Sequence, residues 1–280
     1  MERKIVLKKE HLTSWLLWMM LVIGALVVLF PILVMVSMSF KQQDEIYAKG
    51  FSLIPRVITI QNYITGWREG GFEKYFLNSI YISITRVTIT VIINAMAGFA
   101  FAKYQFIGKD FFFLLILSAM MIPDQIRMIP LYTMMKSLNL IDTHLSVILP
   151  SLGATFGTFL MRQYSQTLPN EILEAARIDG CSELRIFLII SLPLCLPAVV
   201  TNVIFQFMWS WNEFLYPLLF LRDERKYTVQ LALSIFRNSD TVTAGPIMAM
   251  SLLSVVPIVA IFFSLQKYFV EGIASHGVKG

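Results

Sequence analysis

Charged residues are scarce in this sequence of 280 residues. Asp, Glu, Lys and Arg make up 15% of the chain, and the apolar residues reach 56%. Soluble domains carry about 25% charged residues, and a soluble chain with so few could hardly cover its surface. The composition excludes an ordinary soluble enzyme and a disordered chain, and it indicates a membrane protein.

Cysteine and histidine are also rare. The two cysteines, Cys181 and Cys195, are too few for a disulfide framework and lack metal-ligand spacing. The three histidines lie far apart and form no HExxH pattern, so no metal site is predicted. The 23 lysines and arginines are scattered rather than clustered, so the net charge of +5 does not indicate nucleic acid as a partner.

The sequence contains no GxxxxGK[ST] loop, the signature that cradles nucleotide phosphates. The nearest approach, Gly108-Lys109-Asp110, lacks the required spacing. We therefore expect that the chain is no enzyme and holds no cofactor of its own.

Six apolar stretches approach the roughly 20 residues that a helix needs to cross a bilayer. They are Trp15–Ser39, Phe76–Phe101, Phe111–Ile129, Leu145–Met161, Leu192–Leu221 and Pro246–Gln266. The first is too long for a signal peptide and has no cleavage site after it, so it is interpreted as a retained anchor. The predicted fold is an all-α membrane protein with six transmembrane helices and both termini on one side.

The third stretch is the weakest of the six. Its apolar run stops before Pro123, and Pro130 follows soon after. We expect a helix that breaks near its outer end, followed by a short surface helix around residues 131–140. Such a break at membrane depth is tolerated only inside protein or beside a wet cavity.

A polar connection over residues 162–191 is longer than two neighbouring helices need. Its apolar residues have helical spacing from Ile172 to Ile178, Gly180 can end that helix in a left-handed cap, and Ser182 can cap the next helix. The pattern predicts two short amphipathic helices joined at a glycine and projecting from the membrane.

This connection carries a spaced signature. Glu174-Ala175-Ala176 is followed after three residues by Gly180, and after nine more by Ile190, one residue and Leu192-Pro193. The pattern resembles the EAA signature of ABC importer permeases at every defined position. The alternative is an amphipathic loop lying on lipid, which would not require so many positions to agree.

The resemblance extends over nearly the whole chain. Residues 123–132, Trp211-Asn212-Glu213-Phe214-Leu215 and the C-terminal Gly277-Val278-Lys279-Gly280 are similar to the carbohydrate branch of that family. Within this branch, the chain looks most like the shorter, six-span permease typified by the smaller permease of the maltose transporter.

The resemblance implies a mechanism and a set of partners. Residues 162–191 would form a cytoplasmic coupling loop that docks on an ATPase, with Glu174, Ala175, Ala176, Asp179, Gly180, Ile190, Leu192 and Pro193 as its motif residues. The implied partners are a second, larger permease, two ATP-binding subunits that hold ATP and Mg, and an external solute-binding protein. Sugar would be the solute, and the bacterial or archaeal cytoplasmic membrane the location.

The segments on one side of the predicted membrane carry as many Lys and Arg residues as the segments on the other side. Charge alone therefore does not orient the chain. The resemblance places the coupling loop, and with it both termini, in the cytoplasm. This gives a cytoplasmic N-terminus over residues 1–14, a permease domain over 15–266 and a cytoplasmic tail over 267–280.

Two charges fall within the apolar stretches. Arg86 and Glu213 lie at similar depths, roughly 15 and 12 Å below the outer ends of their helices at about 1.5 Å per residue, and we expect them to pair. A structural ion pair is the simpler interpretation, and a role in transport is the alternative.

Aromatic and amide residues surround Glu213. Trp209, Trp211 and Asn212 could line a sugar pathway together with Glu213, or they could form an interfacial aromatic belt. In the fourth stretch, Gly153 and Gly157 form a GxxxG pair that predicts close helix packing.

The sequence predicts a permease subunit forming half of the pore of a binding-protein-dependent carbohydrate importer, with a di- or oligosaccharide as solute. One alternative is a permease for a polyol, glycerol phosphate or another non-sugar solute. The others are an ion-coupled secondary transporter, for which neither charged relays nor an internal repeat is visible, and a membrane scaffold without transport.

Overall fold

The computed structural model describes residues 2–48, 50, 52–237 and 243–277, with side chains from residue 14 to residue 268. These residues form helices and connections, with no strand among them. They fall into two compact units, residues 1–71 with 235–254 and residues 72–234 with 255–280. The all-helical fold predicted from the sequence is confirmed.

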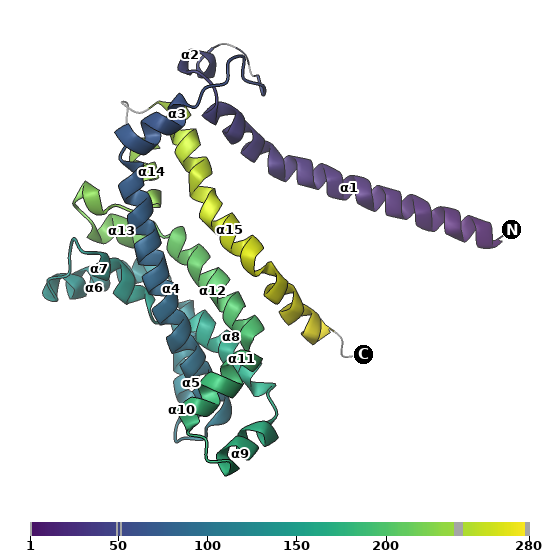
Figure 1. Ribbon diagram of the computed structural model, residues 1–280, viewed down its shortest axis with the longest axis vertical. Helices are drawn as coiled ribbons and strands as arrows, with labels where there is room; N and C mark the ends of the chain where they lie inside the picture. The colour runs from purple at the N-terminus through teal and green to yellow at the C-terminus, as the bar shows by residue number, and fades with distance from the viewer. Residues whose placement is uncertain (1, 49, 51, 238–242, 278–280) are drawn as a thin grey trace. The chain divides into compact units, whose positions relative to one another are not determined.

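The first unit contains the N-terminal helix and a cluster of short helices, seen in purple and blue in Figure 1. Its elements are α1 (Glu2–Ser39), α2 (Gln43–Ile46), α3 (Gln61–Ile64) and the π-helical turn η1 (Thr65–Glu69), with the start of α15 (Ala244–Gly277). The buried amide of Asn62 donates to the backbone carbonyls of Ser39 (2.9 Å) and Lys41 (2.8 Å). These bonds hold the end of α1 against α3.

The second unit is built around α4 (Phe72–Lys103). Along the chain it continues with α5 (Lys109–Ser118), η2 (Ala119–Met121), α6 (Asp124–Ser137), α7 (His144–Ile148), η3 (Leu149–Ser151), α8 (Thr155–Gln166) and α9 (Asn170–Ile178). It then runs through α10 (Glu183–Ile186), η4 (Phe187–Ser191), α11 (Leu192–Leu194), α12 (Leu196–Trp211), α13 (Leu215–Phe220), η5 (Glu224–Lys226) and α14 (Val229–Arg237). Helices α8 and α12 both pack against α4.

A polar contact ties these three helices together at their crossing. Asn94 of α4 accepts a hydrogen bond from Thr158 of α8 (3.0 Å), and its amide nitrogen lies 3.5 Å from Oδ1 of Asn202 on α12. A Cβ atom on Gly157 would overlap both asparagine side chains. Gly157 therefore makes the close approach predicted from the GxxxG pair. Gly153 does not, because it lies in the break before α8 with open space around it.

By length and composition, the described residues hold three helices that could cross a membrane, and up to six spans if each bent helix pair counts as one. Three are continuous helices, Ser14–Ser39, Phe72–Lys103 and Ala244–Tyr268, and three are pairs of helices with a sharp bend between them. With each bent pair counted as one span, the number agrees with the sequence prediction. The break in the third span was predicted, whereas the fourth and fifth stretches, each predicted as one span, are also broken.

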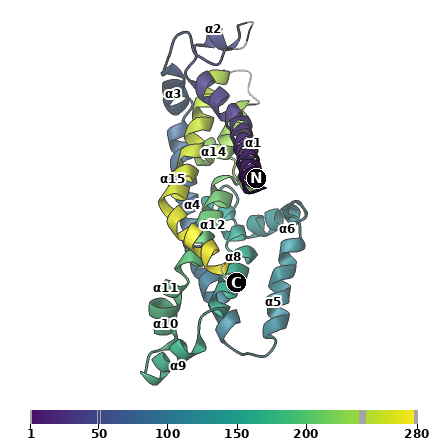
Figure 2. The ribbon, with the colours of Figure 1, turned by 90° about the vertical axis from the view of Figure 1, so that its right-hand side faces the viewer.

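The third span bends earlier than predicted. Helices α5 and α6 meet at 103°, and α6 begins directly after Pro123 rather than near residue 131; Figure 2 shows this corner. Pro123 takes an extended backbone conformation with a ψ of 140°, and Asp124 lies where the positive end of the helix dipole favours an acid. In the fourth span, α7 and α8 bend by 40° after Pro150.

The predicted fifth span, residues 192–221, is not one helix. An 81° bend at Cys195 separates α11 from α12, and α12 ends at Trp211 before the short α13. Pro197 lies in the first turn of α12, where its missing N–H costs no helical hydrogen bond. A proline alone does not break a helix here, because Pro257 lies within α15 and that helix continues past it.

Candidate coupling loop and membrane cavity

The predicted glycine-hinged helix pair is present between α8 and α12. Helix α9 ends beside Gly180, which has a φ of +80°, a left-handed conformation that glycine adopts without steric cost. The next helix, α10, begins at Ser182, whose hydroxyl accepts from the backbone N–H of Arg185 (3.4 Å). Both caps predicted from the sequence are confirmed.

Helix α9 has one face on its own protein and another in the open. Leu173 and Ala176 are buried in an apolar cluster shared with α4, α8 and α10. The remaining motif residues of this segment, Glu174, Ala175, Asp179 and Gly180, are exposed. The side chain of Ile178 is 87% exposed, so an apolar group stands at the tip of the loop with nothing to cover it.

A hydrogen-bonded triad braces the two helices across the hinge. The guanidinium of Arg177 donates from Nε to Oε1 of Glu183 (2.7 Å) and from Nη2 to Oε2 (3.2 Å). The hydroxyl of Tyr104, one residue beyond α4, donates to the same carboxylate. The triad fixes the angle of the hinge and connects it to α4.

A lysine at the end of α4 fastens the start of the loop. Nζ of Lys103 donates to the carbonyl of Leu168 (2.6 Å) and to Oδ1 of Asn170 (2.8 Å). Neither this lysine nor the triad was predicted from the sequence. The opposite charges of Arg177 and Glu183 on either side of Gly180 were the one sequence signal for the triad. Lys103 and Tyr104 are too distant in the chain for a local pattern to connect them with the loop.

The last motif residues lead into the membrane. Ile190 and Leu192 are half-buried against the same apolar cluster as Leu173, and Pro193 is exposed just before the 81° bend. These three residues therefore connect the exposed loop to α12.

A cavity of about 690 Å³ lies beside α12 and the bend between α5 and α6. We call it the Arg86 cavity; its lining includes Arg86, Asp124, Arg127, Phe156, Gln206, Trp209, Asn212, Glu213 and Tyr216. Its size falls within the range of about 300–1,000 Å³ that is typical of small-molecule sites.

Arg86 and Glu213 meet in this cavity. Nη1 of Arg86 is 3.8 Å from Oε2 of Glu213, and both side chains are largely buried. The other carboxylate oxygen, Oε1 of Glu213, accepts from the backbone N–H groups of Leu215 (3.0 Å) and Tyr216 (3.2 Å). The break between α12 and α13 therefore supplies the donors that orient Glu213.

The tryptophans near Glu213 have different environments. Trp209 is 39% exposed and lines the cavity with Asn212. Trp211, the other candidate for the pathway, is 1% exposed and is not among the lining residues; it stacks on Phe207 with ring centroids 5.6 Å apart. Two residues along a helix is about half a turn, so the two indoles face in different directions.

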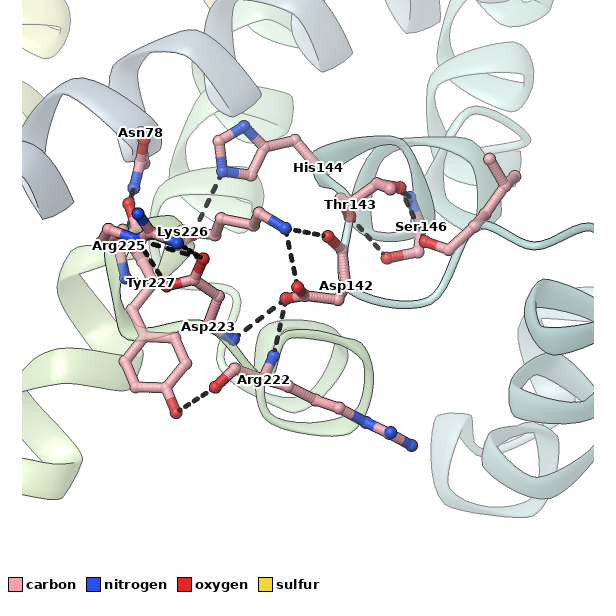
Figure 3. A network of polar contacts seen from close by, with 11 residues as sticks. Asn78, Asp142, Thr143, His144, Ser146, Arg222, Asp223, Arg225, Lys226 and Tyr227 are labelled. Carbon is pink, nitrogen blue, oxygen red and sulfur yellow. Dashed lines mark hydrogen bonds and ion pairs between the residues drawn. The ribbon is translucent and has the colours of Figure 1, made fainter.

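A polar cluster that the sequence did not reveal fastens two distant turns to each other (Figure 3). We call it the Asp142 clamp; its members are Asn78, Asp142, Arg222, Asp223 and Lys226. Oδ1 of Asp142 accepts from the backbone N–H groups of Arg222 and Asp223, each at 3.0 Å, and Oδ2 pairs with Nζ of Lys226 at 2.7 Å. The lysine, followed by these N–H groups, lowers the pKa of Asp142 to about 2.

The clamp also reaches α4. The amide of Asn78 donates to the carbonyls of Arg225 (2.9 Å) and Tyr227 (3.0 Å), on both sides of Lys226. The turn before α7 and the turn before α14 are therefore held to the N-terminal part of α4.

A hinged helix pair, a polar cavity lined by α4, α6, α8 and α12, and up to six candidate spans are the features of a membrane-spanning transport subunit. The sequence comparison gives the same class, because residues 94–275 match the family described as binding-protein-dependent transport system inner membrane component. The chain belongs to this family. It is a permease subunit of an ABC importer, a transport component rather than an enzyme, and a secondary transporter is not favoured.

Relatives match along almost the full chain. The arabinooligosaccharides transport system permease protein AraQ of Halalkalibacterium halodurans is 39% identical, covering 98% of this chain and 99% of its own. The sn-glycerol-3-phosphate transport system permease protein UgpE of Escherichia coli is 30% identical, covering 91% and 93%.

A solved structure shares the fold. A chain of a bacterial ABC transporter involved in the import of the acidic polysaccharide alginate aligns with a TM-score of 0.84 and 24% identity, covering 93% of this chain and 98% of its own. Membership of the family implies work with a partner permease, an ATPase and a solute-binding protein.

Proposed function

We propose that this chain forms half of the translocation pore of a carbohydrate importer and receives the force of ATP hydrolysis through α9 and α10. The observation that carries the proposal is the hinge. A helix pair with a left-handed glycine, a braced angle and an uncovered isoleucine at its tip is a rigid lever that offers a contact to another protein.

The coupling loop would face the cytoplasm, and the even number of spans would place both termini there too. ATP is available on that side. ATP and Mg would be held by two partner ATPase subunits, and a second, larger permease would complete the pore in the cytoplasmic membrane. A binding protein on the other side would deliver the solute.

Support for a carbohydrate comes from the relatives and from the cavity. The AraQ relative is named for arabinooligosaccharides. The Arg86 cavity has an aromatic wall of Phe156 and Trp209, with ring centroids 5.4 Å apart, next to amide groups. Aromatic faces stack on the C–H surfaces of sugars, and amides bond to their hydroxyls.

Two matched exposed isoleucines test the coupling role. Ile178 at the tip of α9 is 87% exposed, and Ile107 in the turn before α5 is 99% exposed. Changing either to Asp leaves the interior of the chain untouched. We expect tagged purification in mild detergent, with partners identified by mass spectrometry, to lose the ATPase subunit in Ile178→Asp and retain it in Ile107→Asp.

The second permease should be recovered with both variants, because the substitutions lie away from the membrane cavity. Retention of the ATPase at wild-type level in Ile178→Asp would contradict docking through α9. A wild-type chain that purifies alone under several gentle conditions would contradict the importer assembly itself.

A further inference from the structure

The Arg86 cavity contains charged residues, but they occur as opposite pairs. Its lining includes two arginines and two carboxylates. Arg86 lies 3.8 Å from Glu213, and Arg127 pairs with Asp124 one helical turn away. The lining of this chain therefore has no net charge, although it is strongly polar.

The geometry of the first pair makes the cavity unsuitable for an anion. A carboxylate or phosphate that approached the guanidinium of Arg86 would come close to the carboxylate of Glu213 as well. Glu213 cannot easily turn away, because its Oε1 is held by the N–H groups of Leu215 and Tyr216. Anion sites in proteins instead present an arginine whose donors are free to bind both oxygens of the ligand.

Uncharged hydrogen-bonding groups are available in the same place. Gln206 is fully buried, and among the described residues neither its Nε2 nor its Oε1 has a hydrogen-bond partner. Nε and Nη1 of Arg86 also lack a hydrogen bond, since 3.8 Å exceeds hydrogen-bonding range. Buried polar groups without partners are rare because each costs free energy, so such a group beside a cavity indicates a ligand or water.

We infer that the Arg86 cavity receives an uncharged polyhydroxylated solute, a neutral glycoside, and disfavours anionic solutes such as sugar phosphates and uronates. The inference rests on the proposed transport function and narrows it. A hydroxyl group both donates and accepts, so one sugar satisfies the amide of Gln206 and the free N–H groups of Arg86 without disturbing Glu213. Trp209 and Phe156 supply the apolar wall.

A thiol probe measures the charge balance of the cavity without relying on transport. Gly153 lines the cavity, and a side chain added there meets open space. In the assembled transporter, with Cys181→Ser and Cys195→Ala as background, Gly153→Cys would be modified with anionic and cationic methanethiosulfonates. Each rate is divided by the rate for a free thiol.

We expect the ratio of anionic to cationic rates to stay within about threefold of unity, and to rise about tenfold in Glu213→Gln, where Arg86 loses its counter-charge. Arg86→Gln should shift it by a similar factor in the opposite direction. A ratio already shifted tenfold toward the anionic reagent before either substitution would overturn the inference.

Uptake by proteoliposomes containing the complete transporter and its binding protein gives the second measurement. Labelled arabinotriose and glycerol 3-phosphate serve as the neutral and anionic probes. We expect uptake of arabinotriose, with a KM raised at least fivefold by Gln206→Leu. Glycerol 3-phosphate uptake with an equal or lower KM would overturn the inference. ATP-dependent uptake of neither probe nor any other sugar would instead contradict the proposed function, while the thiol ratio would still decide the charge balance.

Discussion

The two ends of α4 fasten two regions that are built in different ways. At the C-terminal end, Lys103 and Tyr104 hold the coupling loop, which leaves Ile178 uncovered and most of its motif exposed. At the N-terminal end, Asn78 joins the Asp142 clamp, where backbone and side-chain groups satisfy each other. The first region leaves an apolar side chain exposed, whereas the polar groups of the second region bond to one another.

The comparison has a functional meaning. A helix pair that transmits force must keep its own angle and expose the surface that a partner contacts. The bonds between Arg177 and Glu183 hold that angle, and the outer face of α9 stays exposed. A clamp resists movement between two turns and needs no partner. Changes in the coupling loop should therefore affect assembly and transport, and changes in the clamp should affect local stability.

Gly180→Pro should have the largest effect. Proline fixes φ near −65°, whereas Gly180 has a φ of +80°, so the hinge must change its direction. We expect loss of ATPase co-purification and transport reduced to roughly a tenth or less, since a strained or displaced hinge costs on the order of 1–3 kcal/mol. Pull-down and proteoliposome uptake measure both effects.

The matched control is Gly108→Pro, because Gly108 is an exposed glycine with the same φ of +80° outside the loop. If both variants lose the ATPase equally, the loss reflects general damage, and Ile178→Asp decides the question. Wild-type transport in Gly180→Pro would show that the hinge does not couple, and the contrast between the two ends of α4 would disappear.

Glu213→Ala should have the next largest effect, because it leaves the buried guanidinium of Arg86 without its counter-charge. Breaking a buried pair in this way typically costs about 3 kcal/mol or more. We expect less monodisperse protein in size-exclusion chromatography. The charge swap, Arg86→Glu with Glu213→Arg, should recover part of the lost monodisperse protein.

No recovery in the double variant, with both single variants impaired, would show that the two residues act separately. Glu213 is held by backbone N–H groups, but Nε and Nη1 of Arg86 have no hydrogen bond within the described part of the chain. The test therefore asks how much this ion pair contributes to stability compared with the Asp142 clamp.

The sequence predicted the geometry of the glycine-hinged helix pair well because its determinants are local. Gly180, Ser182 and the apolar spacing of α9 lie within a dozen residues, and each acts on its own neighbourhood. The meeting of Arg86 with Glu213 was also predictable, since depth along a span follows from counting residues at a fixed rise per residue.

The remainder depends on contacts between distant residues. Asp142 and Lys226 are separated by 84 positions, and no local pattern marks either of them. The break in the third span was predicted, although its angle of 103° was not. The 81° bend in the fifth span is also hidden, because the apolar composition of a bent helix pair is that of a straight span. The inward turn of Trp211 follows from the packing of Phe76 and Phe207 around it.

Asp142→Asn should loosen the clamp by about 1 kcal/mol, as expected when a partly exposed ion pair loses its charge. The amide oxygen can still accept from Arg222 and Asp223, so the turns should stay folded. Hydrogen exchange measured by mass spectrometry should be about fivefold faster across residues 220–228. ATPase co-purification should be unchanged.

Asp223→Asn is the matched control, because the side chain of Asp223 pairs with Arg225 in its own turn. Its contact with Asp142 is made by the backbone N–H, which the substitution keeps. It should change exchange by less than about twofold. Equal effects of the two variants would mean that bridging contributes nothing, and loss of the ATPase in Asp142→Asn would erase the distinction between the regions.

Acid should release the same clamp. The pKa of Asp142 is about 2 in the folded protein and about 3.9 in an unfolded chain. A lowered folded pKa gives stability that is present above pH 4 and is lost as pH falls toward 2. The ratio of exchange rates between Asp142→Asn and wild type cancels the intrinsic pH dependence. It should be constant from pH 7 to pH 5 and approach one near pH 2; a constant ratio down to pH 2 would contradict the lowered pKa.

Tyr104→Phe should have the smallest effect. It tests whether the helix pair α9 and α10 needs all the hydrogen bonds to Glu183 for coupling. The variant removes one donor from Glu183 but leaves both bonds from Arg177 and the ring packing on Phe99. One hydrogen bond of this kind is worth about 0.5–1.5 kcal/mol, and the exposed carboxylate can take a water instead. We expect transport per ATP hydrolysed to fall by about twofold with assembly intact. In Glu183→Gln, which weakens all three bonds, transport per ATP hydrolysed should fall further. Equal values for the two variants would mean that the tyrosine alone sets the hinge angle.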